Sequence, residues 1–89
     1  MATRGEVYEA LDSEREYQIR KWGDLDDRNA IGDFLIYMER ELQKARDSYY
    51  SPDEPRGVLD GIRKVTAIGV ATLEKYGAPS GEGHADHPR

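Results

Sequence analysis

The stretch VTAIGVATL, residues 65–73, constrains the fold of this chain more than any other. It is apolar on nearly every side of a helix, and such a helix must be covered by neighbours over most of its surface. The rest of the sequence offers only two further helix-forming stretches. We therefore expect an all-α, three-helix protomer whose bundle is completed by oligomerisation.

The composition bounds the class of protein. A chain of 89 residues, 37% hydrophobic and 35% charged, can form one small domain with a thin core. We expect residues 1–78 to form that domain and the polar residues 79–89 to form a flexible tail. Cysteine is absent, which excludes disulfides and thiolate metal sites. No signal peptide or membrane-length apolar run is visible, so we expect a cytoplasmic protein without a membrane partner. The net charge of −5 disfavours a nucleic acid polymer as partner.

Local signals set the expected helix boundaries. Thr3 and Glu6 have the spacing of a capping box, which predicts a first helix over residues 4–22. Asn29 is a suitable N-cap for a second helix, and Gly77 is suited to end a third helix over about residues 54–76. The second helix carries apolar residues at helical spacing, namely Ile31, Phe34, Leu35, Met38, Leu42, Ala45 and Tyr49.

The first helix has an unusual apolar stripe. Val7, Ala10, Leu11, Ile19 and Trp22 form it incompletely, and Trp22 is expected to close the core from one edge. On the continuation of the stripe, three positions where aliphatic residues are expected hold Glu14, Tyr17 and Gln18 instead.

Aromatic and cationic side chains lie close together near the end of the first helix. Tyr17 lies one turn before Lys21, which places an aromatic ring beside a cation, and this combination can hold a nucleotide base and phosphate. Arg63 and Lys64 of the third helix are expected to face the same cleft. The alternative is that Trp22 only closes the core and the cations pair with Glu14 and Glu16. The predicted ligand-binding residues are Tyr17, Arg20, Lys21, Trp22, Tyr37, Arg40, Lys44, Arg63 and Lys64.

The acids of the second helix could belong to a metal site or to a solvated face. Glu39 and Glu41 are two residues apart and therefore point to different sides of the helix. A Mg²⁺ site would need Glu41 to meet Asp60 and Glu14 across the bundle. The alternative is a charged surface, which is the usual place for such residues.

Two motifs resemble a known family. The sequence EREYQIRKWG near the start and the sequence LDGIRKVTAIGVA over residues 59–71 look like the small phage-encoded relatives of the MazG-type, all-α NTP pyrophosphohydrolases. The similarity covers roughly residues 9–77. It implies an all-α, MazG-like helical bundle that oligomerises and binds a nucleotide between its helices.

The chain departs from this family at the expected metal site. The family holds Mg²⁺ with an E-E-x-x-E motif on one helix and an E-x-x-D motif on the next. In the first motif Glu39 is an acid, but Arg40 and Gln43 replace the other two acids. The second motif falls on residues 61–64, which carry no acid at either end.

These replacements favour binding over catalysis. Cations in place of metal-binding acids repel a metal and attract phosphate directly. We therefore expect no cofactor, no metal and no catalytic residue, and a phage protein that sequesters a cyclic nucleotide or ADP-ribose-type immune signal. One alternative is a Mg²⁺-dependent NTP pyrophosphohydrolase that uses Glu39, Glu41 and Asp60. A second alternative is a structural or interaction module.

Overall fold

A computed structural model describes residues 1–23, 29–50 and 55–81 of the chain. They form the α-helices α1 (Arg4–Trp22), α3 (Ile31–Ser48) and α4 (Arg56–Tyr76), and these described residues contain no β-strand. The all-α prediction is confirmed. Predictions for residues 24–28, 51–54 and 82–89, including the start of the third helix at residue 54 and most of the tail, lie outside the described residues.

The ends of α1 and α4 follow from local hydrogen bonds. The Thr3 hydroxyl accepts from the backbone N–H of Glu6, and the Glu6 carboxylate accepts from the backbone N–H of Thr3, which confirms the capping box. Gly23 and Gly77 follow the two helices with φ angles of 55° and 112°. Each donates its N–H to a carbonyl four residues earlier, and glycine adopts these positive φ angles without a Cβ clash.

The predicted N-cap of α3 is wrong by one residue. Ala30 caps the helix, and its N–H donates to the Asp33 carboxylate at 2.8 Å. Asn29 lies just before the cap and is held by other partners. Its backbone carbonyl accepts from the Lys75 ammonium at 2.7 Å and from the Tyr76 hydroxyl at 3.0 Å. These bonds tie the start of α3 to the end of α4.

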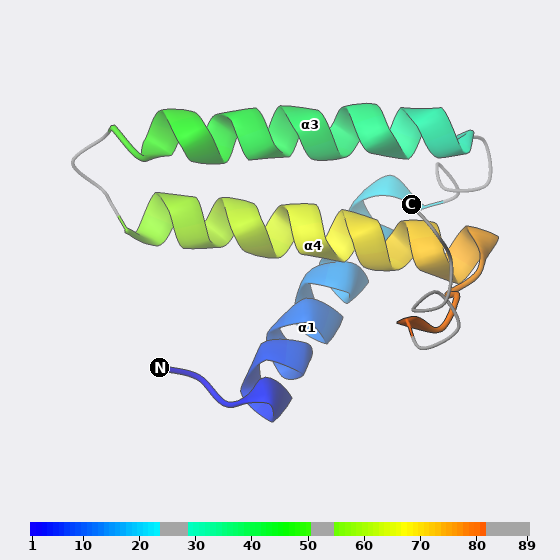
Figure 1. The fold of residues 1–89 in the computed structure, drawn as a ribbon, viewed down its shortest axis with the longest axis horizontal. Helices are drawn as coiled ribbons and strands as arrows, with labels where there is room; N and C mark the ends of the chain where they lie inside the picture. Colours follow the sequence, from blue (N-terminus) through cyan, green and yellow to red (C-terminus); the bar gives the residue numbers. More distant parts are fainter. Residues whose placement is uncertain (24–28, 51–54, 82–89) are drawn as a thin grey trace.

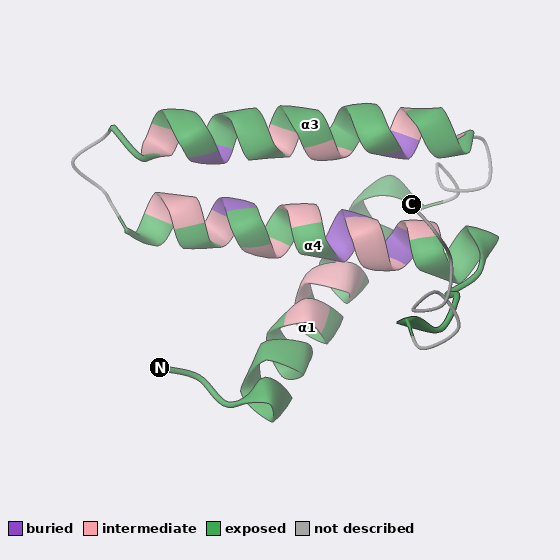
Figure 2. Cartoon of the chain, in the orientation of Figure 1, coloured by how far each residue is buried: buried purple, intermediate pink, exposed green. Residues whose placement is uncertain are grey.

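The helices α3 and α4 lie side by side as an antiparallel pair, and α1 crosses α4 obliquely (Figure 1). Buried positions occur on the facing sides of α3 and α4 (Figure 2). The core cluster consists of Phe34, Ile68 and Ala71, with Met38 packed against it. Among the described residues only Ala45 and Ala67 are further buried hydrophobic side chains, so the core is as thin as the composition predicts.

The predicted apolar stripe of α1 is wrong. Val7 and Ile19 are about half exposed, whereas Gln18 is only 2% exposed. Two ion pairs join the helix to α4, since the Arg15 guanidinium pairs with Glu74 at 2.8 Å and the Glu14 carboxylate pairs with Arg63 at 2.9 Å. Since α1 crosses α4 instead of lying along it, only its polar middle is covered.

A glycine sets the distance between α3 and α4. A Cβ atom built on Gly61 would lie 2.5 Å from the Cβ of Ala45, which is closer than carbon atoms approach, and 3.2 Å from its Cα, which is a tight contact. We expect Gly61→Ala to lower the free energy of unfolding by about 1 to 3 kcal/mol through overpacking, despite the better helix propensity of alanine.

The matched control for Gly61→Ala is Gly32→Ala in α3, where an added Cβ meets nothing within 4 Å. This variant should be neutral or more stable by up to about 1 kcal/mol. Urea unfolding of both variants at one protein concentration measures the difference. Equal stability of the two variants would mean that the helices are not held this closely.

Candidate site: a cavity between α1, α3 and α4

A cavity of about 280 Å³ lies between the three helices. Its floor is the core cluster, and its walls combine aromatic rings, amides and charged groups. The ring of Phe34 lies edge-on to that of Tyr37, with centroids 6.4 Å apart. The lining residues are Gln18, Trp22, Asn29, Phe34, Tyr37, Arg40, Glu41, Lys44, Ile68 and Ala71.

Gln18 is the buried polar side chain of this cavity. It is 2% exposed, and its carboxamide makes no hydrogen bond with any residue that the structure describes. Its position in the chain explains the burial, because Leu11, Glu14 and Gln18 recur at helical spacing on the side of α1 that meets α4. A buried amide normally has a hydrogen-bond partner, so this one marks a place where a polar group can bind.

The charged lining residues in the described part of the chain, Arg40, Glu41 and Lys44, sum to one positive charge. The Lys44 ammonium lies 3.3 Å from the Glu41 carboxylate, and these side chains are 71% and 22% exposed. Within the described part of the chain the Arg40 guanidinium has no hydrogen-bond or ion-pair partner. Arg40 can therefore offer its planar set of N–H donors to a bound anion.

The structure brings four of the nine predicted ligand-binding residues to this cavity, namely Trp22, Tyr37, Arg40 and Lys44. The expectation that Trp22 closes the core is wrong, because its side chain is 39% exposed and lines the cavity instead. The cause is the oblique crossing of α1, which places the last turn of that helix at the wall of the cavity and out of contact with the core cluster at its floor.

The other predicted residues lie elsewhere. Tyr17, Arg20 and Arg63 line a second, shallower depression between α1 and α4. Lys21 lies with its ammonium 5.7 Å from the centroid of the Tyr17 ring and 5.9 Å from that of the Trp22 ring. Lys64 is exposed and lines neither hollow.

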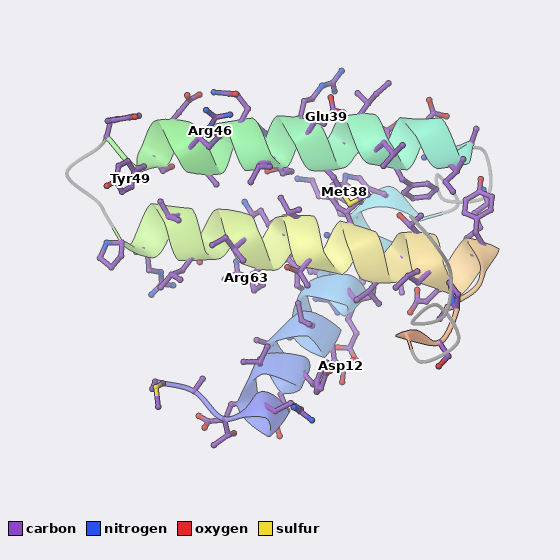
Figure 3. All side chains as sticks on the ribbon, viewed as in Figure 1. Asp12, Met38, Glu39, Arg46, Tyr49 and Arg63 are labelled. Atoms are coloured by element: carbon purple, nitrogen blue, oxygen red, sulfur yellow. The ribbon has the colours of Figure 1, made fainter. Side chains whose placement is uncertain are left out.

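Arg63 is engaged by two acids. Its guanidinium, on the α1 side of α4 (Figure 3), donates to Glu14 at 2.9 Å and to Asp60 at 2.7 Å. The hydrogen bond from Arg63 holds the pKa of Asp60 below its usual value, and Glu14 and Asp60 together raise the pKa of Arg63. This corresponds to the alternative in which the cations pair with acids, so the structure favours Arg63 as a link between α1 and α4.

The three acids of the hydrolase alternative lie in different surroundings. Glu39 points away from the helix pair (Figure 3), Glu41 lines the cavity, and Asp60 binds Arg63 and Arg56. Among residues 1–23, 29–50 and 55–81, no group of three or more acids or histidines is placed to hold a metal ion. The alternative metal set is therefore not brought together here.

The sequence missed Gln18, Phe34 and Glu41 as residues of this cavity. Gln18 carried a signal, since an amide stood where an aliphatic residue was expected. Phe34 was predicted only as part of the apolar pattern of the second helix, and Glu41 only as a member of the alternative metal set.

None of the helices in the described residues is long and apolar enough to span a membrane. No protein-family model, curated protein or solved structure matches the chain. The resemblance to MazG-type proteins therefore stays a hypothesis, and the proposed function is based on the chemistry of the cavity.

Proposed function

We propose that this protein binds a nucleotide-like anion in the cavity between α1, α3 and α4 without hydrolysing it. The proposal rests on one observation. Aromatic rings meet in one cavity with a buried amide and a guanidinium that have no partner among residues 1–23, 29–50 and 55–81. An aromatic wall favours a planar ring, and a guanidinium binds phosphate with two parallel hydrogen bonds. A volume of about 280 Å³, just below the usual range for small-molecule pockets, suits one nucleoside unit.

The replacement of acids by cations supports binding without catalysis. Pyrophosphohydrolysis uses a divalent metal to neutralise the phosphates and activate water. Arg40 stands where the resembling hydrolases carry an acid, and a cation there neutralises phosphate directly. Held intact, a nucleotide-derived immune signal would be sequestered, which is the role we propose for a phage-encoded protein of this kind.

A thermal-shift screen tests the proposal. Nucleoside triphosphates, cyclic dinucleotides and cyclic ADP-ribose isomers are compared, and a ligand at a hundred times its Kd should stabilise the fold by about 2.7 kcal/mol. The bound ligand is then recovered from denatured protein and identified by mass spectrometry. Intact ligand supports sequestration. Release of pyrophosphate in Mg²⁺ or Mn²⁺ would favour the hydrolase, and the absence of any shift would favour an interaction module.

We also infer that a second copy of the chain covers an apolar face of α3 and α4. This apolar face consists of Ile31, Leu35, Leu42, Leu59, Ile62 and Leu73, each between 48% and 60% exposed. On α4, Ile62 and Leu73 lie on a different side from Arg63 and Glu74, which contact α1. Leu59 is one turn before Arg63 and lies at the edge of the apolar face that is nearer to α1. The helices α3 and α4 are in contact beside this face, since a Cβ on Gly69 would lie 3.9 Å from the Met38 sulfur.

Light scattering at micromolar concentration should show an oligomer. Leu35→Lys should shift the mass toward that of one chain, because the ammonium would be buried without a partner. Ile36→Lys is the matched control, since Ile36 is also half exposed but lies on another side of α3. A wild-type monomer would contradict the inference.

A further inference from the structure

Gln18 presents a donor and an acceptor to the cavity at once. A carboxamide offers N–H donors and a carbonyl acceptor side by side, and that of Gln18 is buried without a partner among the described residues. A glutamine pairs with two adjacent atoms of a base when the base carries an exocyclic amine beside a ring nitrogen acceptor. The buried amide is thus suited to read the edge of a planar base.

Glu41 supplies a second acceptor in the same cavity. Its carboxylate is 22% exposed and accepts one hydrogen bond from Lys44 at 3.3 Å, which leaves further lone pairs for a ligand. A carboxylate accepts only, so it favours a ring with an amine and disfavours one with a carbonyl at that point. Gln18 and Glu41 therefore select the same feature of a base.

We infer that Gln18, assisted by Glu41, makes this cavity specific for a base whose Watson–Crick edge has an exocyclic amine beside an acceptor nitrogen, as in adenine and cytosine. This inference rests on the proposed function and specifies which chemical group of the ligand the cavity recognises. Arg40 binds the phosphate of the same ligand. The base then lies over the apolar floor formed by Ile68 and Ala71, and the phosphate remains near solvent.

The experiment compares ligands that differ only at the amine. The probes are adenosine 5′-monophosphate with purine riboside 5′-monophosphate, which lacks the amine, and cytidine with uridine 5′-monophosphate. Calorimetry on the full chain should show the amine-bearing member of at least one pair binding about 5-fold to 150-fold more tightly. The pair that shows the difference identifies the base as adenine or cytosine.

The variant Gln18→Leu should reduce this preference sharply and leave the binding of inorganic pyrophosphate unchanged. Leucine has a similar size and suits a buried helix position, so the fold should be retained. The matched control is Gln43→Leu, because Gln43 is exposed on α3, does not line the cavity and donates to Asp47 at 2.9 Å. The control should bind every probe as the wild type does.

Two outcomes would overturn the inference, and they are distinct from failure of the proposed function. Equal binding of both members of each pair by the wild-type protein, or an unchanged preference in Gln18→Leu, would mean that Gln18 does not read the base although nucleotides bind. The wild-type comparison needs no variant and so does not depend on how Gln18→Leu folds. If neither the nucleotides nor pyrophosphate bind, both the inference and the proposed function are wrong.

Discussion

Phe34→Ala is expected to lower the free energy of unfolding by about 3 to 5 kcal/mol. Phe34 is 2% exposed and belongs to the core cluster with Ile68 and Ala71. Its ring also meets the rings of Tyr37 and Tyr76 edge-on, with centroids 6.4 and 6.3 Å apart. Alanine removes the largest side chain of a very small core and leaves a cavity in its place.

Urea unfolding followed by circular dichroism measures this effect at one protein concentration. Phe34→Leu, which keeps most of the volume, should cost less than about 1.5 kcal/mol. Tyr8→Ala serves as an aromatic control, because Tyr8 is 59% exposed on α1 and should change stability by no more than about 0.5 kcal/mol. If Phe34→Ala is as mild as Tyr8→Ala, the core lies elsewhere than in this cluster.

Arg40→Ala is expected to weaken binding of a nucleotide by about tenfold to a hundredfold, with little effect on folding. A hydrogen bond to a charged group contributes about 1.5 to 3 kcal/mol, and every 1.4 kcal/mol is a factor of ten in Kd. Arg40 is exposed and has no partner among the described residues, so its removal leaves no buried group unpaired. Calorimetry with the nucleotide found in the screen measures the change.

Two further variants sharpen the Arg40 result. Arg40→Lys keeps the charge but loses the planar pair of donors, and should bind with intermediate affinity. Arg46→Ala removes an exposed cation from the same helix that does not line the cavity, and should bind as the wild type does. Equal losses in Arg40→Ala and Arg46→Ala would indicate attraction by overall charge instead of a contact in the cavity.

The sequence by itself determined the helices and most of their ends. Thr3 with Glu6 begins α1, and glycines at 23 and 77 follow α1 and α4, because these hydrogen bonds join residues only three or four positions apart. The apolar spacing of the second helix likewise predicted Phe34 and Met38 on the side that packs. Such features depend on a few neighbouring residues and can be read without a tertiary structure.

The tertiary structure decided which face of α1 is covered. The sequence placed Val7, Ile19 and Trp22 inward, but the apolar residues of that helix are not gathered on one side. Glu14 and Arg15 therefore settled the packing by pairing with Arg63 and Glu74 across 49 and 59 positions of the chain. Ion pairs between distant residues leave no periodic pattern in a sequence, so no reading of α1 alone could predict them.

Some residues of the cavity could be predicted from the sequence, and others became clear only from the tertiary structure. Its cations and rings were visible in the sequence as Tyr37, Arg40 and Lys44 on one helix, because residues three and four apart share a face. The burial of Gln18 and the loss of Arg63 from the site came only from the crossing of α1 over α4. That crossing fixes which polar groups are removed from water, and desolvation, more than residue type, determines whether a polar side chain can recognise a ligand.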